Sequence, residues 1–359
     1  MKNNIYICTT QYHLFNIVNI IHGFYQEDRN YLIVLDCIPT LVNRIYEQAI
    51  KADLFEKVII VEVGQIKGNF KSYLSSIRRI LFPKNIKMIL ENPDRVFISG
   101  TEIYSRIIAF NFLKNPNTKL FYYEDGMESY DTLLNRQVTN RSNRILKMRF
   151  GYYLIERCVA IYVYKPEYVS GNKYEIPVKK IPTIAVGGSW AIELKKIFGR
   201  ASEIFPREKI IYFDAWFNSD KARNENRKIV SSIISIFGEK LIVKPHPSNL
   251  KEWSKIKNVK VFESVTTFET LCLTENINDK TLISMFSTAC ILPKMIFNEE
   301  PRIILTYRLY KKYCNEWKKF DTLFENVKND YADKQKFIIL NDVRELDNIK
   351  LSGKYVKNN

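Results

Sequence analysis

Short runs of β-branched and aromatic residues alternate with longer amphipathic stretches along the first half of the chain. The short runs predict buried strands at Ile5–Thr9, Tyr31–Asp36, Val58–Val63, Arg95–Ser99, Leu120–Tyr123 and Ala160–Tyr164. The longer stretches predict helices at Tyr12–Phe24, Thr40–Ala52, Asn69–Leu81, Glu102–Leu113 and Arg144–Cys158. Such alternation of strands and helices indicates a parallel sheet with both faces covered.

The second half of the chain repeats this pattern. It predicts strands at Lys209–Phe213, Lys240–Val243, Val259–Phe262, Thr281–Ser284, Arg302–Leu305 and Phe337–Leu340, and helices at Asn224–Phe237, Thr288–Phe297 and Tyr307–Phe320. We interpret Gly187 to Pro206 as the connection between the halves, and Ser352–Asn359 as a frayed tail. The prediction is an α/β protein with Rossmann-like domains at residues 1–188 and 189–359. Two such domains facing each other form a cleft, and ligands bind beyond the carboxyl ends of the strands.

The length and composition agree with two globular domains. The chain has 359 residues, of which 46% are hydrophobic and 26% are charged, and a domain takes roughly 150 residues. No apolar run reaches the ~18 residues of a membrane span, and the start at Met1-Lys2-Asn3-Asn4 lacks the features of a secretory signal. We therefore expect a cytoplasmic protein.

The chain is strongly basic, with 55 Lys and Arg against 39 Asp and Glu, which gives a net charge of +16. This surplus suits nucleic acid, an anionic membrane face, or substrates bearing phosphate or carboxylate, although it also describes an ordinary solvated basic surface. No zinc-finger, RNP-type or helix-turn-helix pattern is present, so nucleic acid is the weakest choice. Six scattered cysteines without a C-x-x-C pair and only three histidines predict no metal site and a reducing compartment.

The first candidate for chemistry is an acidic motif that follows a strand. The apolar run Phe121-Tyr122-Tyr123 leads directly into Glu124-Asp125-Gly126, so the two acids lie at the carboxyl end of a strand and Gly126 permits a tight turn. One carboxylate can face the cleft while the other binds backbone groups. A carboxylate beside an acceptor hydroxyl can act as a general base, whereas the alternative is an ordinary polar turn.

The second candidate is Lys244-Pro245-His246-Pro247, which also ends a buried strand. The flanking prolines restrict the backbone and hold the imidazole of His246 in one direction. A histidine in this place can donate to a phosphate or protonate a leaving group, and Lys244 adds positive charge. The alternative is a capped turn with a structural histidine.

Three weaker candidates also follow strands. Ser287 or Thr288 is the expected N-cap of a helix. The free N–H groups at a helix start can bind phosphate, and the alternative is that the residue only caps the helix. The loop Thr9-Thr10-Gln11 can contact a substrate or cap the next helix, and we interpret His13 and His22 as satisfied helix residues. Asp214, after the first strand of the second half, competes for the role of base, with Asp220 a weaker candidate nearby.

Together these motifs resemble bacterial sialyltransferases and polysialyltransferases. Those enzymes carry a D/E-D/E-G motif, an H-P motif and a later Ser/Thr pair, which correspond here, in the same order, to Glu124-Asp125-Gly126, His246-Pro247 and Ser287-Thr288. The opening Cys8-Thr9-Thr10-Gln11-Tyr12-His13-Leu14 is similar to the start of the family-52 glycosyltransferases, which include lipooligosaccharide and capsule sialyltransferases.

The resemblance implies a GT-B fold, no metal or cofactor, and an inverting displacement from CMP-sialic acid to a sugar hydroxyl of a surface glycan. It implies that Glu124 or Asp125 deprotonates the acceptor in the first domain, with Asp214 as the alternative base. It further implies that His246 contacts or protonates the CMP phosphate and that Ser287 and Thr288 hold it. Our full set of substrate-binding candidates is Lys244, Pro247, Ser287, Thr288, Gln11, Thr10 and Gly126.

Two other functions remain open on the sequence. A GT-B glycosyltransferase with another donor, such as a UDP-hexose, would need the same phosphate-binding devices. A basic α/β binding protein in surface-polysaccharide assembly would need no catalytic residues. The basic surface would favour peripheral contact with the anionic inner membrane, and the sequence is compatible with a homodimer without fixing the oligomeric state.

Overall fold

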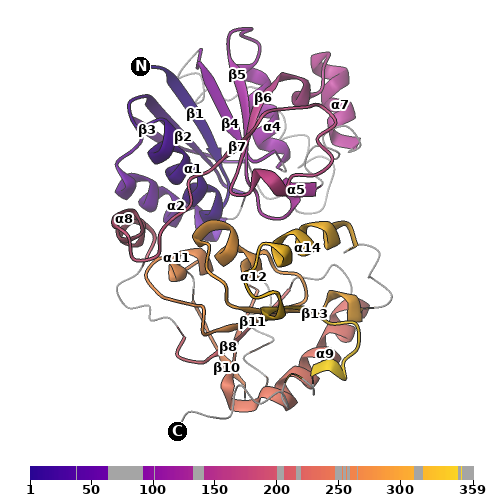
Figure 1. Cartoon of the computed structure of the whole chain (residues 1–359). Helices are drawn as coiled ribbons and strands as arrows, with labels where there is room; N and C mark the ends of the chain where they lie inside the picture. Colours follow the sequence, from indigo (N-terminus) through magenta and orange to yellow (C-terminus); the bar gives the residue numbers. More distant parts are fainter. Residues whose placement is uncertain are drawn as a thin grey trace. The chain divides into compact units, whose positions relative to one another are not determined.

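A computed structural model describes residues 1–37, 39–63, 92–100, 102–131, 141–199, 206–215, 220–246, 259–264, 266–310 and 318–346, together with Trp253, Ile256 and Ile349. The chain divides into two compact domains, Met1–Pro182 and Thr183–Asn359 (Figure 1). The boundary predicted between residues 188 and 189 lies a few residues after this division at Pro182. The predicted helix at Asn69–Leu81, the tail Ser352–Asn359 and the candidate Pro247 lie outside the described residues.

The first domain contains one parallel sheet. In sequence order its strands are β1 (Asn3–Cys8), β2 (Arg29–Leu35), β3 (Lys57–Val61), β4 (Arg95–Ile98), β5 (Lys119–Tyr123), β6 (Cys158–Val163) and β7 (Val178–Lys180). Their order in space is β3-β2-β1-β4-β5-β6-β7. The six predicted strands of this half are confirmed. The short edge strand β7 was not predicted, because Val-Lys-Lys carries no apolar pattern.

Helices flank this sheet (Figure 1): α1 (Gln11–Phe24), α2 (Pro39–Ala52), α4 (Ile103–Phe112), the short α5 (Glu128–Asp131) and α7 (Arg141–Phe150). The helix predicted at Arg144–Cys158 is wrong in its second half. Helix α7 ends at Phe150, and Gly151 follows with a φ of 90° that favours glycine and stops the helix. A short 3₁₀ turn, η1 (Leu154–Arg157), then leads into β6.

Aromatic residues fix the register of the central strands. The ring of Phe97 on β4 stacks on Tyr6 of β1 at 4.4 Å and on Phe121 of β5 at 4.9 Å. Each pair consists of residues directly opposite each other in the parallel ladders. Such stacking adds about 0.5–1.5 kcal/mol per pair beyond simple burial. The packing therefore sets where β1, β4 and β5 end, and so where the polar residues after them lie.

The second domain contains another parallel sheet, with β8 (Ile210–Phe213), β9 (Leu241–Lys244), β10 (Lys260–Val261), β11 (Thr281–Ser284), β12 (Arg302–Leu305) and β13 (Phe337–Ile339). Their order in space is β10-β9-β8-β11-β12-β13. The six strands predicted in this half are confirmed. The helices are α8 (Ser189–Phe198), α9 (Asp220–Phe237), α11 (Phe268–Cys272), α12 (Thr288–Leu292) and α14 (Asp321–Asn329).

Three predictions in this half need correction. The segment from Gly187 to Pro206 is not a plain connection, because α8 forms within it and buries Ala191, Leu194 and Phe198. The helix predicted at Thr288–Phe297 is continuous, but it changes from α to π geometry at Pro293. The helix predicted at Tyr307–Phe320 is described only at its two ends, which are the 3₁₀ turns Tyr307–Leu309 and Lys318–Phe320. Helix α14 begins after them, at Asp321.

Counted along each domain, both sheets have the Rossmann order 3-2-1-4-5-6, with β7 added at the edge of the first. The chain reverses direction across the sheet between β1 and β4 in the first domain and between β8 and β11 in the second. Ligands of such folds bind beyond the carboxyl ends of the strands near these points. Two Rossmann-like domains in one chain confirm the predicted α/β fold class of GT-B type.

Among the described residues, none of the helices combines the length and the apolar composition required to cross a membrane.

Replacing Gly23 tests how α1 packs within the first domain. A Cβ atom at Gly23 would lie 2.5 Å from Cγ of Pro182, whose carbonyl is fixed by the Asn19 side chain at 2.8 Å. Alanine normally stabilises a helix relative to glycine, but here Gly23→Ala should lower the free energy of unfolding by about 1–2 kcal/mol. Denaturant titration measures the change. Ser231→Ala, at an exposed position of α9, is the control, and an unchanged or higher stability of Gly23→Ala would contradict the packing.

Candidate active site

Polar side chains of the first domain gather where β1 and β5 end. Thr9, Thr10 and Gln11 follow β1, while Glu124, Asp125 and Gly126 follow β5, with β4 between these two strands. The carboxyl ends of parallel strands share one edge of the sheet, so residues about 112 positions apart in sequence are brought into contact there.

Glu124 is completely buried at this edge. Its Oε1 accepts a hydrogen bond of 2.7 Å from the hydroxyl of Tyr12, and its Oε2 accepts from the hydroxyl of Tyr130 and, at 3.0 Å, from the backbone N–H of Tyr164. Burial raises the pKa of Glu124 to about 7, although these three donors oppose the rise. This carboxyl therefore binds α1, α5 and the residue after β6 to the end of β5, and it has no surface on which to meet a substrate.

Asp125 points to a different partner and keeps part of its surface. Its Oδ1 lies 2.6 Å from Nε2 of His13, and its side chain is 22% exposed against 3% for His13. The backbone N–H of Thr9 donates to Nδ1 of His13 at 3.3 Å, and the Thr9 hydroxyl lies 2.8 Å from the same nitrogen. Since Nδ1 accepts from the backbone, the neutral ring carries its hydrogen on Nε2 and donates it to Asp125.

The turn after Asp125 fixes its backbone. Gly126 has a φ of 72°, a conformation that residues with a side chain rarely adopt. The backbone N–H of Asp125 donates to the hydroxyl of Ser129 at 2.7 Å, and the N–H of Ser129 donates to the carbonyl of Gly126 at 3.1 Å. Gly126 therefore serves the turn, and its contact with substrate stays a prediction.

The loop after β1 acts mainly as a helix cap. The hydroxyl of Thr10 accepts from the backbone N–H of His13 at 3.1 Å, which makes Thr10 the N-cap of α1. Gln11 is buried, and its amide donates to the side chain of Gln48 at 3.0 Å. Thr10 keeps partial exposure. Substrate binding by Gln11 and Thr10 stays a prediction.

The interpretation of His13 as a satisfied helix residue is confirmed, and one of its partners is Asp125 of the acidic motif. Tyr12 and Asn16, on the same helix, also bind the acidic motif: Asn16 donates to the carbonyl of Glu124 at 3.0 Å. The sequence held one signal for these contacts. Tyr12, His13 and Asn16 are polar residues within a largely apolar helix, and Asn16 is three and four positions from the other two, a spacing that shares a face.

In the second domain, three candidate motifs follow three adjacent strands. Asp214 follows β8, Lys244 ends β9 ahead of His246, and Ser287 and Thr288 come after β11. Asp214 is buried, and its Oδ2 accepts from the indole N–H of Trp253 at 2.8 Å and from the backbone N–H of His246 at 3.3 Å. The structure thus joins Asp214 to the His246 loop, and the role of Trp253 was not predicted.

His246 and Lys244 differ in their surroundings. Burial lowers the pKa of His246, although the negative charge of Asp214 opposes this. The ammonium of Lys244 lies 3.4 Å from the carbonyls of both Ser264 and Thr266 and 5.2 Å from the ring centre of Phe262. Lys244 therefore donates hydrogen bonds to the loop after β10, and its partial exposure still allows it to add positive charge at the strand ends.

The Ser287-Thr288 pair begins a helix, as predicted. The Ser287 side chain accepts from the N–H of Ala289 at 3.3 Å, so Ser287 is the N-cap of α12. The buried Ser284 hydroxyl accepts from the N–H of Ser287 at 3.0 Å and donates to the carbonyl of Phe213 at 3.1 Å, which ties this turn to the end of β8. Ser287 and Thr288 both remain partly exposed.

Within the described ranges, no three His, Cys, Asp or Glu residues lie close enough to hold a metal ion. Metal independence of the chemistry stays a prediction.

Solved structures similar to this chain over nearly its full length share its fold. A putative UDP-N-acetylglucosamine 2-epimerase from Listeria monocytogenes has 10% identity and a TM-score of 0.54, covering 100% of this chain and 98% of that one. UDP-N-acetylglucosamine 2-epimerase from Rickettsia bellii has 13% identity and a TM-score of 0.50, covering 98% and 95%. S. aureus MnaA, in a co-structure with UDP, has 14% identity and a TM-score of 0.50, covering 94% of each chain.

Sequence comparison supplies the family. No curated protein sequence matches the chain. The family profile described as Alpha-2,8-polysialyltransferase (POLYST) matches residues 4–307, a span that contains Glu124-Asp125-Gly126, His246-Pro247 and Ser287-Thr288. The predicted resemblance to bacterial sialyltransferases and polysialyltransferases is thereby confirmed. This chain is a glycosyltransferase that belongs to the alpha-2,8-polysialyltransferase family.

Proposed function

We propose that the protein is an inverting, metal-independent sialyltransferase that moves sialic acid from CMP-sialic acid to a sugar hydroxyl of a surface glycan, either lipooligosaccharide or capsule. Membership of the polysialyltransferase family supports the choice of sugar. One observation supports the mechanism above the others: the carboxylate of Asp125 is held by His13 at the carboxyl edge of the first sheet and keeps 22% of its surface exposed.

Asp125 is our choice for the general base, in preference to Glu124 and Asp214. Glu124 is fully enclosed and bound by three donors from the protein. The two oxygens of Asp214 accept from the N–H groups of Ala215, His246 and Trp253. A base must reach the hydroxyl that it deprotonates, and Asp125 combines partial exposure with an orientation fixed by His13.

The proposed reaction is a single displacement. Asp125 takes the proton of the acceptor hydroxyl while the hydroxyl oxygen forms a bond to the anomeric carbon of sialic acid. The bond between that carbon and the phosphate oxygen breaks, and CMP leaves with the electron pair. Attack on the face opposite the leaving group inverts the anomeric configuration.

The second domain would hold the donor. Lys244 brings positive charge, His246 brings an imidazole that can donate to the phosphate or protonate it, and Ser287 and Thr288 bring hydroxyl groups at a helix start. Lys244 and His246 come at the carboxyl end of β9, and Ser287 comes after β11, so they flank β8, which lies between these two strands. A phosphate site near the β8–β11 reversal would use these strand ends. Pro247, outside the described residues, would restrict the backbone at His246. On the side of the first domain, Thr10, Gln11 and Gly126 stay proposed substrate contacts.

We place the enzyme in the cytoplasm, in peripheral contact with the anionic inner face of the membrane. The net charge of +16 supports this placement, as does a glycolipid acceptor, which would be presented at that surface.

The nucleotide preference tests the donor. CMP at about one hundred times its Kd should stabilise the protein by about 2.7 kcal/mol and raise its Tm, whereas UDP, GDP and ADP should have little effect. CMP-sialic acid should be turned over at the same rate with and without EDTA. Thermal shift and product analysis measure these outcomes. Stabilisation by UDP but not CMP would favour a UDP-hexose donor, and loss of turnover in EDTA would refute metal independence.

Substitution of each candidate base separates their roles. Asp125→Asn should lower kcat roughly a thousandfold because the acceptor keeps its proton, with little change in the KM for the donor. Asp53→Asn is the matched control, since Asp53 is exposed and its φ of 51° suits asparagine. Steady-state kinetics with a soluble acceptor provides the comparison.

The same kinetics can reject the assignment of the base. If Asp214→Asn abolishes kcat while Asp125→Asn retains most of it, the base is Asp214. Circular dichroism of each variant establishes that it is folded before its rate is interpreted.

The raised pKa of Glu124 predicts how stability depends on pH. The folded state holds this proton up to about pH 7, whereas an unfolded glutamate releases it near its ordinary pKa of about 4.3. The free energy of unfolding therefore falls by roughly 3 kcal/mol through this group as the pH rises from about 4.5 to 7. Above pH 7 the contribution of this group no longer changes.

Glu124→Gln removes this titration. The difference in free energy of unfolding between the original protein and Glu124→Gln should fall by roughly that amount between about pH 4.5 and 7. Denaturant titrations at several pH values measure it. Glu27→Gln, at an exposed position of the same domain, controls for the change in net charge. A difference that stays constant across this range would show that Glu124 is ionised throughout.

A further inference from the structure

We propose that helix α7 is a docking surface for anionic lipid membranes, inserting Ile145 and Met148 among the head groups while the arginines beside them bind phosphate. This inference deepens the membrane contact of the proposed function and rests on that part of it alone. It does not depend on the donor or on the base.

The inner face of α7 is anchored to the first domain. The ring of Phe150 stacks on Phe110 of α4 at 4.3 Å, and Leu146 is buried. The guanidinium of Arg106, also on α4, donates to the buried side chain of Asn143. These contacts hold the helix against α4 and fix which of its faces points outward.

The outer face carries two large apolar side chains. Met148 is 87% exposed and Ile145 is 58% exposed, and they are the most exposed large hydrophobic residues described after Met1. Each residue of an α-helix is rotated by about 100° from the one before it. On this geometry, an arc of about 140° around the helix contains Arg144, Ile145, Met148 and Arg149. A single exposed apolar residue is common, but two adjacent ones on one helix face indicate a surface with a partner.

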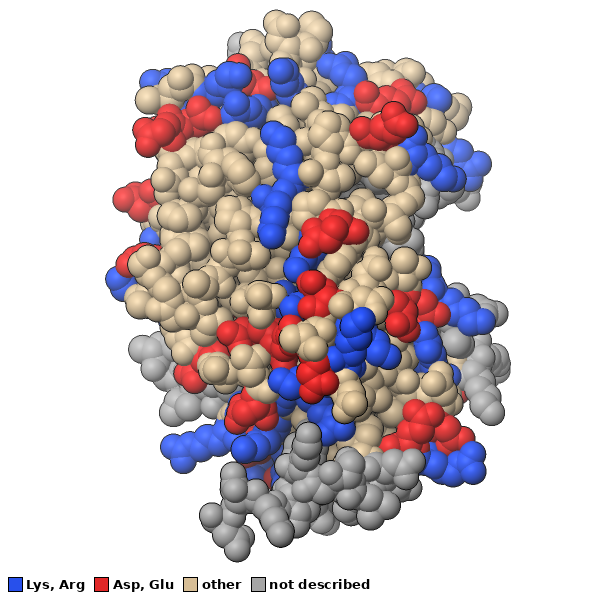
Figure 2. Space-filling view, viewed as in Figure 1, with Lys and Arg blue, Asp and Glu red and all other residues tan. Residues whose placement is uncertain are grey.

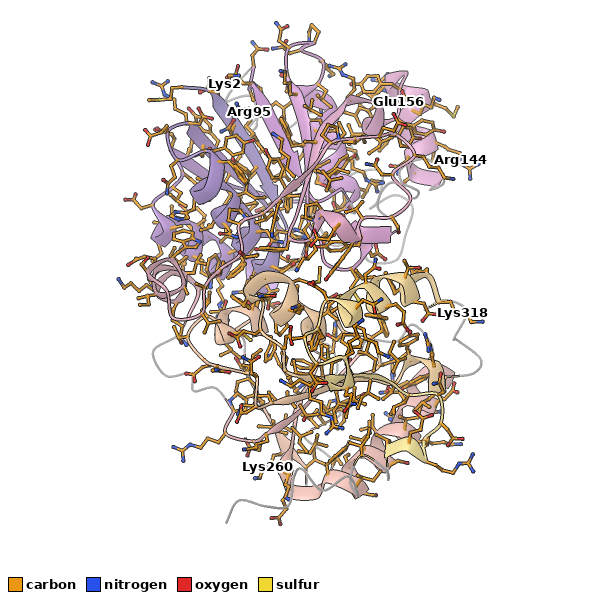
Figure 3. The ribbon with its side chains drawn as sticks, viewed as in Figure 1. Lys2, Arg95, Arg144, Glu156, Lys260 and Lys318 are labelled. Carbon is orange, nitrogen blue, oxygen red and sulfur yellow. The ribbon has the colours of Figure 1, made fainter. Side chains whose placement is uncertain are left out.

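Positive charge surrounds these two residues. The helix Arg-Ser-Asn-Arg-Ile-Leu-Lys-Met-Arg-Phe contains no acidic residue, and Arg144 and Arg149 are exposed. Figure 3 shows Arg144 at the outer edge of the first domain, directed away from the sheet, and Figure 2 shows lysine and arginine side chains gathered there. Glu156, also labelled in Figure 3, lies beyond the helix, on η1.

Two tyrosines follow the helix immediately. Tyr152 and Tyr153 come directly after the turn at Gly151. The guanidinium of Arg157 lies 5.4 Å from the ring centre of Tyr152, and the ammonium of Lys147 lies 4.1 Å from the ring centre of Tyr153. Both tyrosines are partly exposed. Amphipathic aromatic rings beside basic residues and exposed apolar side chains are the composition of a helix that lies in a membrane interface.

This composition selects a lipid surface over other anions. A polyanionic glycan would contact the arginines but gain nothing from Ile145 and Met148. An anionic bilayer offers both phosphate groups for the arginines and an apolar layer for the two side chains. Basic residues contribute to such binding only near an anionic surface, so vesicles of neutral lipid should bind poorly.

Vesicle sedimentation tests the proposal with the full chain. The unmodified protein should bind vesicles of phosphatidylcholine with phosphatidylglycerol and bind pure phosphatidylcholine vesicles much more weakly. The double change Ile145→Ser and Met148→Ser should lower the partition coefficient roughly tenfold. The double change Arg144→Gln and Arg149→Gln should lower it roughly thirtyfold, and added salt should weaken what remains.

Helix α8 provides a matched control. It also has ten residues, an exposed Ile192 and a lysine, Lys196, but that lysine pairs with Glu193 at 2.6 Å. The double change Ile192→Ser and Lys196→Gln should leave vesicle binding within about twofold. Turnover of a water-soluble acceptor should be unchanged in all three double variants, so a loss of vesicle binding is not a loss of folding or catalysis.

Three results would overturn the proposal. One is equal vesicle binding by the unmodified protein and both α7 variants. Another is no binding to anionic vesicles while the protein turns over a soluble acceptor, which leaves the proposed reaction intact. The third is binding to dextran sulfate that is lost with Arg144→Gln and Arg149→Gln, together with vesicle binding unaffected by Ile145→Ser and Met148→Ser, which would make this face a polyanion site.

Discussion

The buried carboxyl of Glu124 joins the parts of the first domain that the candidate site requires. It lies at the end of β5, where a charged group without partners would cost several kcal/mol. The hydroxyls of Tyr12 and Tyr130 and the N–H of Tyr164 supply its partners, and they belong to α1, α5 and the segment after β6. Satisfying this one group therefore positions three elements around the next residue, Asp125.

The second domain uses the same principle with Asp214. This buried carboxylate follows β8, and the N–H groups of Trp253, His246 and Ala215 bind its oxygens. The neighbouring His246 keeps part of its surface. In each domain, an acid enclosed by donors fixes the backbone, and a partly exposed candidate side chain lies beside it. A rigid support of this kind keeps a reactive group oriented without further cost when the substrate binds.

The sequence predicted the strands better than the helices. Runs such as Leu120–Tyr123 and Thr281–Ser284 are short, apolar and followed by polar residues, and each became a strand with the expected motif at its end. Helix ends were predicted less accurately because the boundaries of a helix depend on single residues and on packing. Helix α7 ends before Gly151 because of the backbone conformation of that glycine. Helix α8 forms in a segment predicted to be a connection, and it does so because Ala191, Leu194 and Phe198 become buried.

Residue order alone predicts the two α/β halves, the order of the motifs and the strand ends at which they lie, because alternation of apolar and polar residues is a local property of the chain. The folded chain was needed to show which acid is enclosed and which is partly exposed, and that His13 contacts Asp125. Those two residues are 112 positions apart, and they meet because β1 and β5 pair on either side of β4. Neither local propensity nor spacing records that pairing, since it depends on how the whole sheet buries its faces.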